Sequence, residues 1–356
     1  MTEQQSSITE RIKERLIELY HSLPRSGSRT VTLVGSGSWG TALAKVLLEQ
    51  CSSIVWYLRN DESIREFKKQ GRNPNYLSSV PFDVSRINFT SDINKAVQAS
   101  DIIIFVTPSP YLKAQLEQLT QPLSNKIVVS AIKGIIPGEN LICSDFFHTV
   151  YKVPEEQIVI LSGPSHAEEI ALNRLTYLTV ASLNLSLAKR AARLLQTPYL
   201  VTSPSVDIRG IQYAAVMKNV YAIAAGICHG LKYGDNFKAV LVAAAIREMR
   251  SVLKVLSPLS RNIDDSVYLG DLLVTCYSQF SRNQMFGTMI GRGYSVANAQ
   301  LEMHMIAEGY YGARCLHDTF QRLGQDDPAI LAAVYNILHR AVPPRREIEQ
   351  LAQLLK

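Results

Sequence analysis

The sequence predicts an α/β fold in two parts, an N-terminal domain built around a parallel β-sheet and an all-helical C-terminal domain. Short β-branched apolar runs alternate with helical patterns from Arg29 onward, whereas Ala, Leu, Ile and Met dominate after Pro204. A chain of 356 residues is also too long for one ordinary hydrophobic core. We therefore expect a helical extension over residues 1–28, an α/β domain over 29–203 and an all-α domain over 204–356.

The first 28 residues are predicted to form an amphipathic helix that precedes the two domains. Ile8, Ile12, Leu16 and Tyr20 recur at helical spacing among charged residues, and the pattern ends near Pro24. We interpret this helix as packing on the protein surface or on a partner subunit, and nothing in it suggests catalysis.

Apolar runs predict the strands of the sheet. Near-continuous apolar character is typical of parallel strands that crossover helices cover on both faces. Two weaker runs, 177–181 and 199–202, are expected to extend the same sheet. The main runs span residues 30–34, 54–58, 102–106, 127–131 and 158–161.

A glycine-rich turn follows the first predicted strand and precedes a predicted helix over 41–49. Gly35, Gly37 and Gly40 have the G-x-G-x-x-G spacing. In that motif the first glycine permits a tight turn, the second lets the backbone approach a pyrophosphate, and the third lets helix and strand pack closely. Because both flanks have the required pattern, we interpret the segment as the dinucleotide-binding turn of a Rossmann domain rather than as a structural turn.

The residues after the second predicted strand leave the identity of the dinucleotide open. The motif expects an acidic residue about 20 residues after the turn, which binds the ribose 2′-hydroxyl. Here Arg59 and Asn60 follow the strand, with Asp61 one position later. An arginine can pair with a 2′-phosphate or stack on adenine, and it can also be a solvated surface residue. The cofactor is therefore NAD or NADP.

Loops after the later strands carry further candidates. Ligands bind beyond the carboxyl ends of the strands in such folds. Lys133 could bind an anion there or extend into water. Ser165 could cap the helix that follows it, or its backbone could approach a ligand. His166 has no acidic neighbour in the sequence, so we interpret it as structural.

One lysine of the helical half is a candidate for proton transfer. Lys218 has Ala214, Ala215, Tyr221 and Ala222 as its neighbours at helical spacing. Lysines usually extend to water, so an ammonium on a small-residue face needs an explanation. Burial favours the neutral amine that a general base requires, although a surface position or a structural ion pair would also account for this residue.

Two downstream segments offer groups that suit a phosphorylated substrate. Asp271 lies four residues before Thr275, so both face the same side of a helix. Ser281, Arg282 and Asn283 supply a hydroxyl, a guanidinium and an amide in succession, and an arginine can bind two phosphate oxygens at once. Taken singly, Asp271 could be a helix cap and Arg282 a surface residue.

Composition narrows the class of protein further. The net charge of +6 is mild and no dense basic run occurs, which favours small anionic ligands over nucleic acid. No apolar run reaches the roughly 18 residues of a membrane span, and the polar N-terminus has no secretory pattern, so we expect a cytoplasmic protein. The five cysteines are scattered and the seven histidines lack metal-ligand spacing, which predicts reduced thiols and no metal site.

Taken together, these segments resemble the NAD(P)-dependent sn-glycerol-3-phosphate dehydrogenases of the bacterial cytoplasmic type. The resemblance implies reversible hydride transfer that reduces dihydroxyacetone phosphate to sn-glycerol 3-phosphate, the backbone precursor of glycerophospholipids. It also implies a homodimer. The matching motifs occur in the family's order at residues 35–44, 133–134, 162–165, 216–220, 269–276, 281–283, 286–287 and 307–310.

The resemblance further implies a role for individual residues. Lys218 matches the family's catalytic lysine, and Lys133 and Asp271 are further catalytic candidates. Asp271 and Asn219 are candidates to orient Lys218. The cofactor would be held by the glycine turn together with Ser38, Trp39, Arg59, Ala167, Ile306 and Glu308. The substrate would be held by Lys133, Gly163, Ser165, Asn219, Asp271, Ser281, Arg282 and Asn283, of which Lys133 and Arg282 also lie near the cofactor.

Three features depart from the family pattern. Ala244 stands where the family usually has an arginine, and a second proline at Pro110 precedes Tyr111 where the family more often has His or Gln after a single proline. The N-terminal extension is longer than usual. These differences bear on regulation, subunit contacts and cofactor preference.

Other classes of function stay open at this point. A 3-hydroxyacid or 6-phosphogluconate dehydrogenase would act on a carboxylate and would not need the group at 281–283. A non-catalytic NAD(P)-binding sensor would leave Lys218 on its alanine face unexplained. A purely structural protein would have no use for a dinucleotide turn.

Overall fold

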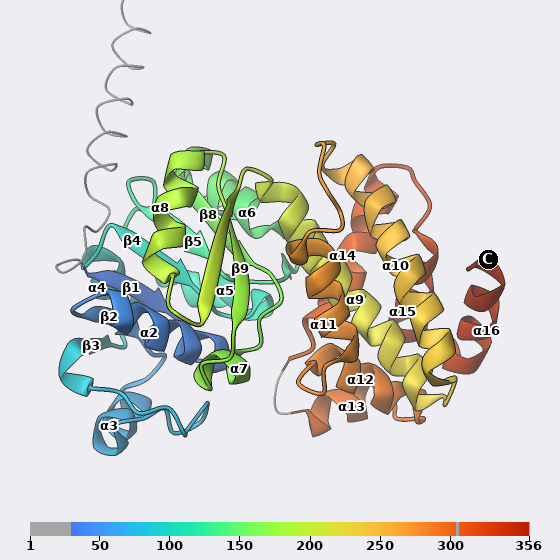
Figure 1. Ribbon diagram of the computed structural model, residues 1–356, viewed down its shortest axis with the longest axis horizontal. Helices are drawn as coiled ribbons and strands as arrows, with labels where there is room; N and C mark the ends of the chain where they lie inside the picture. Colours follow the sequence, from blue (N-terminus) through green and yellow to red (C-terminus); the bar gives the residue numbers. More distant parts are fainter. Residues whose placement is uncertain (1–29, 304–305, 356) are drawn as a thin grey trace, which may run out of the picture.

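The structure is a computed structural model that describes residues 30–303 and 306–355. It has two parts, a sheet covered by helices and an all-helical part beside it (Figure 1). The predicted fold class is therefore confirmed. The predicted helix within residues 1–28 lies outside the described residues. In the described ranges, no helix combines the length and the apolar character needed to cross a membrane.

An eight-stranded sheet forms the centre of the N-terminal part, in the order β10-β9-β8-β5-β4-β1-β2-β3. Both faces of the sheet are covered, because alternate residues of β2 belong to different hydrophobic clusters, Val55 and Tyr57 to one and Ile54 and Trp56 to the other. The strands are β1 (Val31–Val34), β2 (Ile54–Tyr57), β3 (Ile87–Thr90), β4 (Ile102–Phe105), β5 (Ile127–Ser130), β8 (Ile158–Ser162), β9 (Thr176–Ala181) and β10 (Leu200–Ser205).

The two weaker apolar runs extend the sheet as β9 and β10, and the sheet is not parallel throughout. Strand β9 pairs antiparallel with β8, whereas the other neighbouring strands pair in parallel. The backbone of Gly163 lies against Tyr177, so the chain turns back at the carboxyl end of β8 instead of crossing to the other end. Strand β3 was not predicted, because it is partly exposed and lacks a continuous apolar run.

Short helices and one hairpin connect these strands. The hairpin is formed by β6 (Ile135–Ile136) and β7 (Leu141–Ile142). The helices are α2 (Ser38–Gln50), α3 (Asp61–Gln70), α4 (Ile93–Gln98), α5 (Ser109–Leu116), α6 (Cys143–Tyr151), α7 (Ala167–Ala171) and α8 (Leu185–Leu195), with 3₁₀ turns at Val84–Arg86 and Glu155–Gln157.

The C-terminal part is organised around one buried helix, α9 (Ile208–Gly230). Its many Ala and Gly residues let neighbouring helices approach closely. A Cβ added to Gly226 would overlap the carbonyl oxygen of Gln284, and one added to Gly287 would overlap that of Ile223. The surrounding helices are α10 (Gly234–Leu256), α11 (Asp271–Tyr277), α12 (Arg282–Gly291), α13 (Val296–Glu302), α14 (Glu308–Arg322), α15 (Ala329–His339) and α16 (Pro344–Leu354), and a π-helix, η3 (Ser266–Gly270), precedes α11.

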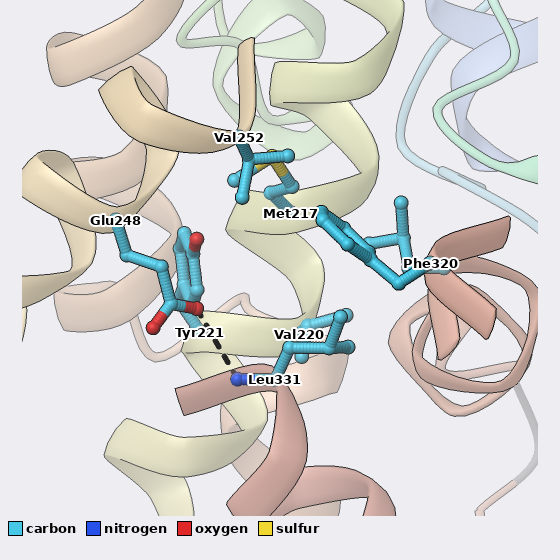
Figure 2. A pocket seen from close by; sticks show the side chains of 8 residues that line it. Met217, Val220, Tyr221, Glu248, Val252, Phe320 and Leu331 are labelled. Atoms are coloured by element: carbon cyan, nitrogen blue, oxygen red, sulfur yellow. Dashed lines mark hydrogen bonds between the residues drawn. The ribbon is translucent and has the colours of Figure 1, made fainter. Parts of the chain in front are cut away.

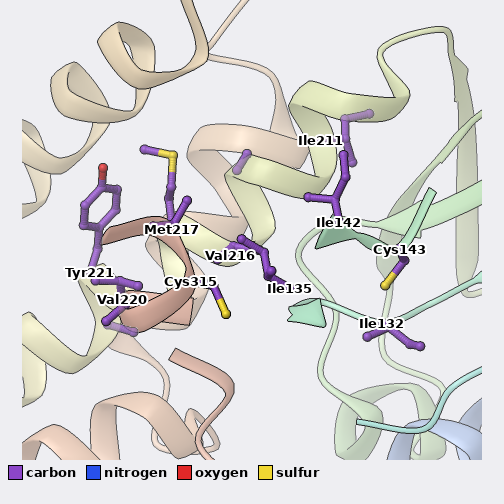
Figure 3. Close-up of a cluster of buried hydrophobic side chains, with 14 of the residues drawn as sticks. Ile132, Ile135, Ile142, Cys143, Ile211, Val216, Met217, Val220, Tyr221 and Cys315 are labelled. Atoms are coloured by element: carbon purple, nitrogen blue, oxygen red, sulfur yellow. The ribbon is translucent and has the colours of Figure 1, made fainter. Parts of the chain in front are cut away.

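The two parts share one hydrophobic cluster. Side chains of α9, including Val216, pack beside Ile135 and Ile142 of the β6–β7 hairpin (Figure 3). Strand β10 continues to Ser205 and α9 begins at Ile208, so the predicted boundary at residue 203 falls inside β10. The division into domains at that position stays a prediction.

Candidate active site

The glycine turn has the backbone geometry that its spacing predicts. Gly35 has a φ of +120°, a conformation that favours glycine, and its carbonyl accepts a hydrogen bond of 2.9 Å from the Trp56 indole. A Cβ on Gly40 would overlap the Gly35 carbonyl, so α2 can pack this closely only with glycine there. The space around Gly37 is open to 4 Å. The N-terminus of α2 is therefore accessible to an anionic ligand.

A buried asparagine that sequence reasoning missed holds this turn in place. The Asn73 amide donates to the Ser36 carbonyl at 2.9 Å and to the Thr41 hydroxyl at 2.8 Å. Its carbonyl oxygen accepts from the backbone of Asn75 at 3.0 Å. The Asn-Pro-Asn segment signals a turn in the sequence, but nothing in the sequence places that turn against the glycine motif.

Lys218 and Asp271 form a buried ion pair between α9 and α11. Lys218 is 4% exposed and Asp271 is 1% exposed, and the Lys218 ammonium donates to Asp271 Oδ1. Asp271 Oδ2 is buried, makes no hydrogen bond to the described residues, and lies 3.9 Å from Lys133 Nζ. Asp271 does not cap α11 with its side chain. One carboxylate therefore lies between two lysines that are 85 residues apart in sequence, positions 133 and 218.

Lys133 comes from the loop after β5 and is largely buried. Its ammonium donates to the Gly163 carbonyl at 3.0 Å and to the Ser165 hydroxyl at 3.2 Å. Burial lowers its pKa to about 7, and the positive charge of Lys218 adds to this effect while Asp271 opposes it. Lys133 is therefore a constrained cation and not a solvated loop lysine.

Ser165 does not cap the helix that follows it, so one of its two predicted interpretations is wrong. Its hydroxyl donates to the Gly163 carbonyl at 3.0 Å, and α7 begins after His166 without a side-chain cap. The turn at Gly163 brings the hydroxyl back toward Lys133, because Gly163 has a φ of +133°. Ser165 thus lies at the carboxyl end of β8 beside the lysine cluster.

His166 lies beside the lysine cluster, and its interpretation as a structural residue stays a prediction. Burial and the charges of Lys133 and Lys218 lower its pKa to about 4, so its imidazole is neutral at physiological pH. Its ring packs 5.9 Å from that of Phe280, and its Nε2 is buried without a hydrogen-bond partner in the described ranges. The sequence shows no neighbouring charge because the charges arrive from other strands and helices.

Two side-chain amides link the two parts of the molecule around this cluster through three hydrogen bonds. The Asn219 amide donates to the Lys133 carbonyl at 2.8 Å, and the Asn283 amide donates to Asn219 Oδ1 at 2.9 Å. The oxygen of Asn283 accepts from the backbone of Gly309 at 2.9 Å. These bonds connect the loop after β5 with α9, α12 and α14, so Asn219 and Asn283 hold the site together.

The start of α12 presents a guanidinium. Ser281 caps this helix by accepting from the Gln284 backbone at 3.3 Å. Arg282 is half-buried and makes no hydrogen bond or ion pair to the residues that the structure describes. Burial lowers its pKa, while the charges of Glu168 and Glu308 act against that shift. Its donors are therefore available to an anionic ligand.

Glu308, at the start of α14, joins the helical part to the loops after β4 and β5. Its carboxylate accepts from the Ser109 backbone at 2.9 Å and from the Ser109 hydroxyl. Burial raises its pKa. A Cβ on Gly134 would overlap both of these side chains, which shows how closely the segments approach. Ile306 precedes this helix and is half-buried.

The residues predicted to bind a dinucleotide fall into two groups. Ser38 and Trp39 begin α2, and Lys133 Nζ lies 5.7 Å from the centroid of the Trp39 ring, so the turn reaches the lysine cluster. Ala167 begins α7 and is buried. Arg59 is separate, because it is exposed just beyond β2, where Asn60 caps α3 by accepting from Ser63 at 2.8 Å.

The residues present fit a dinucleotide. The Trp39 indole Nε1 is buried without a hydrogen-bond partner in the described part of the chain, and the N-cap residue of α2 is Gly37, which provides no side-chain cap. Open space at Gly37 adjoins these unpaired donors. A glycine turn of this kind, combined with a buried lysine–carboxylate cluster held between an α/β part and a helical part, is typical of a dehydrogenase of the nicotinamide-dinucleotide type.

Comparison with known proteins identifies the family. Residues 30–188 match the description "NAD-dependent glycerol-3-phosphate dehydrogenase N-terminus", and residues 207–349 match the corresponding C-terminus. The chain belongs to the NAD-dependent glycerol-3-phosphate dehydrogenase family. The resemblance inferred from the sequence is confirmed.

Individual relatives agree along most of their length. The glycerol-3-phosphate dehydrogenase [NAD(P)+] of Latilactobacillus sakei is 33% identical over 328 residues, which cover 91% of this chain and 96% of the relative. That of Salinibacter ruber is 34% identical and covers 90% of this chain and 94% of its own. The crystal structure of glycerol-3-phosphate dehydrogenase from Coxiella burnetii superimposes with a TM-score of 0.83 at 27% identity, over 91% of this chain and 99% of that one.

Proposed function

We propose that this protein catalyses the NAD(P)H-dependent reduction of dihydroxyacetone phosphate to sn-glycerol 3-phosphate. Family membership and the names of the relatives support the reaction. The observation that carries the proposal is the buried Lys218–Asp271–Lys133 cluster, which lies beside Trp39 of the glycine turn. The product is a precursor for the backbone of glycerophospholipids.

In this proposal the substrate phosphate is bound by Arg282 and by the protonated form of Lys133. Arg282 has a guanidinium with unused donors, and the Lys133 ammonium is fixed by Gly163 and Ser165. An arginine fork and a lysine point charge together suit a phosphate dianion. This charge favours a phosphorylated substrate over the carboxylate of a hydroxyacid.

Lys218 acts on the oxygen of the substrate carbonyl. As an ammonium it donates a proton to the alkoxide that develops on reduction, and as a neutral amine it removes that proton in the reverse direction. Asp271 fixes the direction of the ammonium through their ion pair, and the 4% exposure of Lys218 limits the access of water. Asn219, next to Lys218 on α9, anchors the helix to the Lys133 loop at 2.8 Å.

The cofactor, when bound, supplies the hydride. Ser38, Trp39 and the glycine turn would hold it together with Ala167, Ile306 and Glu308. Arg59 is exposed beyond β2, in the position where a 2′-phosphate or the adenine would lie in a Rossmann domain. Both NAD and NADP are compatible with this arrangement.

The activity is tested by following NADH and NADPH absorbance with dihydroxyacetone phosphate, and with 3-oxoacids as competing substrates. Lys218→Ala should retain cofactor binding and lose turnover by about 100-fold or more, because it removes the proton donor. Lys238→Ala is the matched control, since Lys238 is also buried, at 8% exposed, but its Nζ lies 4.3 Å from the centroid of the Tyr277 ring. Near-normal turnover in Lys218→Ala removes Lys218 from the mechanism.

Cofactor preference is tested at Arg59. If this side chain pairs with a 2′-phosphate, Arg59→Asp should raise the KM for NADPH by about 10-fold or more and leave the KM for NADH within about 3-fold. Lys68→Asp on α3 is an exposed charge reversal nearby and serves as the control. An unchanged ratio of the two KM values would show that Arg59 is a solvated surface residue.

We also propose that the enzyme is a homodimer and that it works in the cytoplasm. Both follow from the family resemblance, and the five free, buried cysteines are compatible with a reducing compartment. Light scattering after gel filtration gives the mass of the assembly. A mass near 39.6 kDa, that of one chain, would contradict the dimer.

A further inference from the structure

A buried cluster of three side chains lies where the chain passes from the sheet to the helical part. Asp207, two residues after β10, accepts from Arg261 Nε at 2.6 Å and from Arg261 Nη2 at 3.2 Å. The Tyr268 hydroxyl also donates to Asp207, at 2.5 Å. Asp207 is 5% exposed and Tyr268 is 3% exposed. None of these three residues has a role in the reaction described above.

The cluster connects three elements of the helical part. Asp207 caps α9, because its carboxylate accepts from the Gly210 backbone at 2.9 Å. Arg261 secures the end of α10 by donating to the Ser257 carbonyl at 2.7 Å and to the Ser257 hydroxyl at 3.1 Å. Tyr268 belongs to the π-helix that immediately precedes α11. A displacement of any of the three elements therefore disturbs the other two.

The π-helix leads directly to Asp271. The backbone N–H of Asp271 donates to the carbonyls of Ser266 and Tyr268. The residue whose hydroxyl is held by Asp207 is thus the residue whose carbonyl holds the start of α11. π-Helices are rare overall, but those that occur are often found at functional sites, because they place a side chain where a regular helix would not.

These contacts form a closed loop that includes the Lys218–Asp271 pair of the candidate active site. Asp207 caps the helix that carries Lys218, Lys218 pairs with Asp271, the Asp271 backbone is bonded to Tyr268, and Tyr268 returns to Asp207. Both residues of the Lys218–Asp271 pair are therefore connected to the Asp207 carboxylate, Lys218 through α9 and Asp271 through Tyr268. The helix cap and the end of α10 do not need the Tyr268 hydroxyl, whose contribution is the link to the π-helix.

We propose that Asp207, Arg261 and Tyr268 are positioning residues that hold Asp271 between Lys218 and Lys133. This inference refines the proposed function, since it says what sets the geometry of the catalytic cluster. It depends on the contacts above and can be tested without any substrate. Release of the Tyr268 hydroxyl lets η3 and the start of α11 shift, which weakens the contact of Asp271 with both lysines.

The test replaces Tyr268 by Phe, which keeps the ring and removes the hydroxyl. The control is Tyr221→Phe, a buried tyrosine on α9 whose hydroxyl lies beside the Glu248 carboxylate (Figure 2) without a hydrogen-bond partner in the described residues. Tyr268→Phe loses a hydrogen bond to Asp207 and should melt a few degrees lower, whereas Tyr221→Phe removes a hydroxyl that has no hydrogen-bond partner among the described residues and should change the melting temperature less. A change in the titration of Lys133 or in turnover that occurs in Tyr268→Phe but not in Tyr221→Phe therefore indicates positioning.

The readout is the titration of Lys133, followed by NMR of ¹³Cε in lysine-labelled protein. Burial lowers the pKa of Lys133 most, Asp271 raises it and Lys218 lowers it, and His166 is a further titratable group that interacts with Lys133. In Tyr268→Phe the pKa of Lys133 should fall by about 0.5 or more below its value of about 7, and in Tyr221→Phe it should not move. Turnover should fall by about 10-fold in Tyr268→Phe only.

A second variant, at another residue of the cluster, tests whether the effect on Lys133 is confined to the substitution at Tyr268. Asp207→Asn keeps a side-chain oxygen for the cap of α9 but loses the charge that holds Arg261, and it should move the titration in the same direction as Tyr268→Phe. If both variants lose stability while Lys133 titrates as in the unmodified protein, the cluster is structural and the inference is wrong. If the titration moves but the protein does not reduce dihydroxyacetone phosphate, the positioning stands and the proposed function fails.

Discussion

Asp271→Asn tests the central arrangement, one buried carboxylate between two lysines. Asparagine keeps the shape of the side chain and removes its charge. Because Asp271 is 1% exposed and pairs with Lys218, the variant leaves a buried ammonium without its counter-charge. Breaking a buried ion pair from one side typically costs about 3–5 kcal/mol.

The free energy of deprotonating a lysine sets an upper limit on the cost of leaving the ammonium without its counter-charge. A lysine can release its proton instead of remaining charged, and for an ordinary lysine pKa of 10.5 this costs about 4.8 kcal/mol at pH 7, at 1.36 kcal/mol for each pH unit. Lys133 adds little, because its pKa is already about 7. We therefore expect a loss of about 3–5 kcal/mol at pH 7.

The same reasoning predicts how the loss depends on pH. If folding of the variant requires a lysine to release a proton, the unfolded state binds more protons than the folded state, so stability rises with pH up to the unfolded pKa of 10.5. At pH 9.5 the proton-release cost should shrink to about 1.4 kcal/mol. The difference between variant and unmodified protein should therefore narrow as the pH rises.

Chemical denaturation at pH 7 and pH 9.5 measures both quantities. Asp101→Asn is the control, because Asp101 pairs with Lys126 at 3.8 Å but is 67% exposed, and exposed ion pairs contribute about 0–1 kcal/mol. A loss below about 1 kcal/mol at pH 7, or a loss that does not shrink by pH 9.5, refutes the buried-pair argument.

Two further predictions follow from the same geometry. The pKa of Lys133 is lowered to about 7, so its ammonium is lost as the pH rises through 7, and kcat/KM for the phosphorylated substrate should then fall by up to about 10-fold per pH unit. Lys133→Arg keeps the charge and should remove this alkaline fall, whereas a profile identical to that of the unmodified protein would exclude Lys133 as its source. Gly287→Ala should destabilise the protein by about 1–3 kcal/mol, because the added Cβ overlaps the Ile223 carbonyl and forces α12 away from α9. Thermal unfolding measures the loss, and a variant as stable as the parent would contradict the close approach of these two helices.

Features that depend on neighbouring residues in the chain were predictable from the sequence. The glycine turn is an example, because three glycines between an apolar strand and a helix specify a local backbone path. Most of the strands were predicted for the same reason, since buried parallel strands are continuous apolar runs. The unusual position of Lys218 was also visible, because a small-residue face at helical spacing is a local pattern.

The direction in which a strand pairs was harder to predict from the sequence than the existence of the strand. The weak apolar run at β9 gave its existence but not its antiparallel pairing with β8, because the pairing depends on where the chain turns after Gly163. Strand β3 lacked a signal, since a partly exposed edge strand has no continuous apolar run. Ser165 was ambiguous for a related reason, because the turn directs its hydroxyl toward Lys133 and away from α7.

The sequence alone determined the fold class, the dinucleotide turn, the family and the candidate residues of the site, because each of these is encoded in spacing along the chain. Only the tertiary structure decided which of those residues meet. It places Asp271 between two lysines, lowers the pKa of His166 so that the imidazole is neutral, and connects Asp271 to Asp207 through Tyr268. These contacts join positions far apart in sequence, and they are set by the packing of α9 against its neighbours, which no local pattern records.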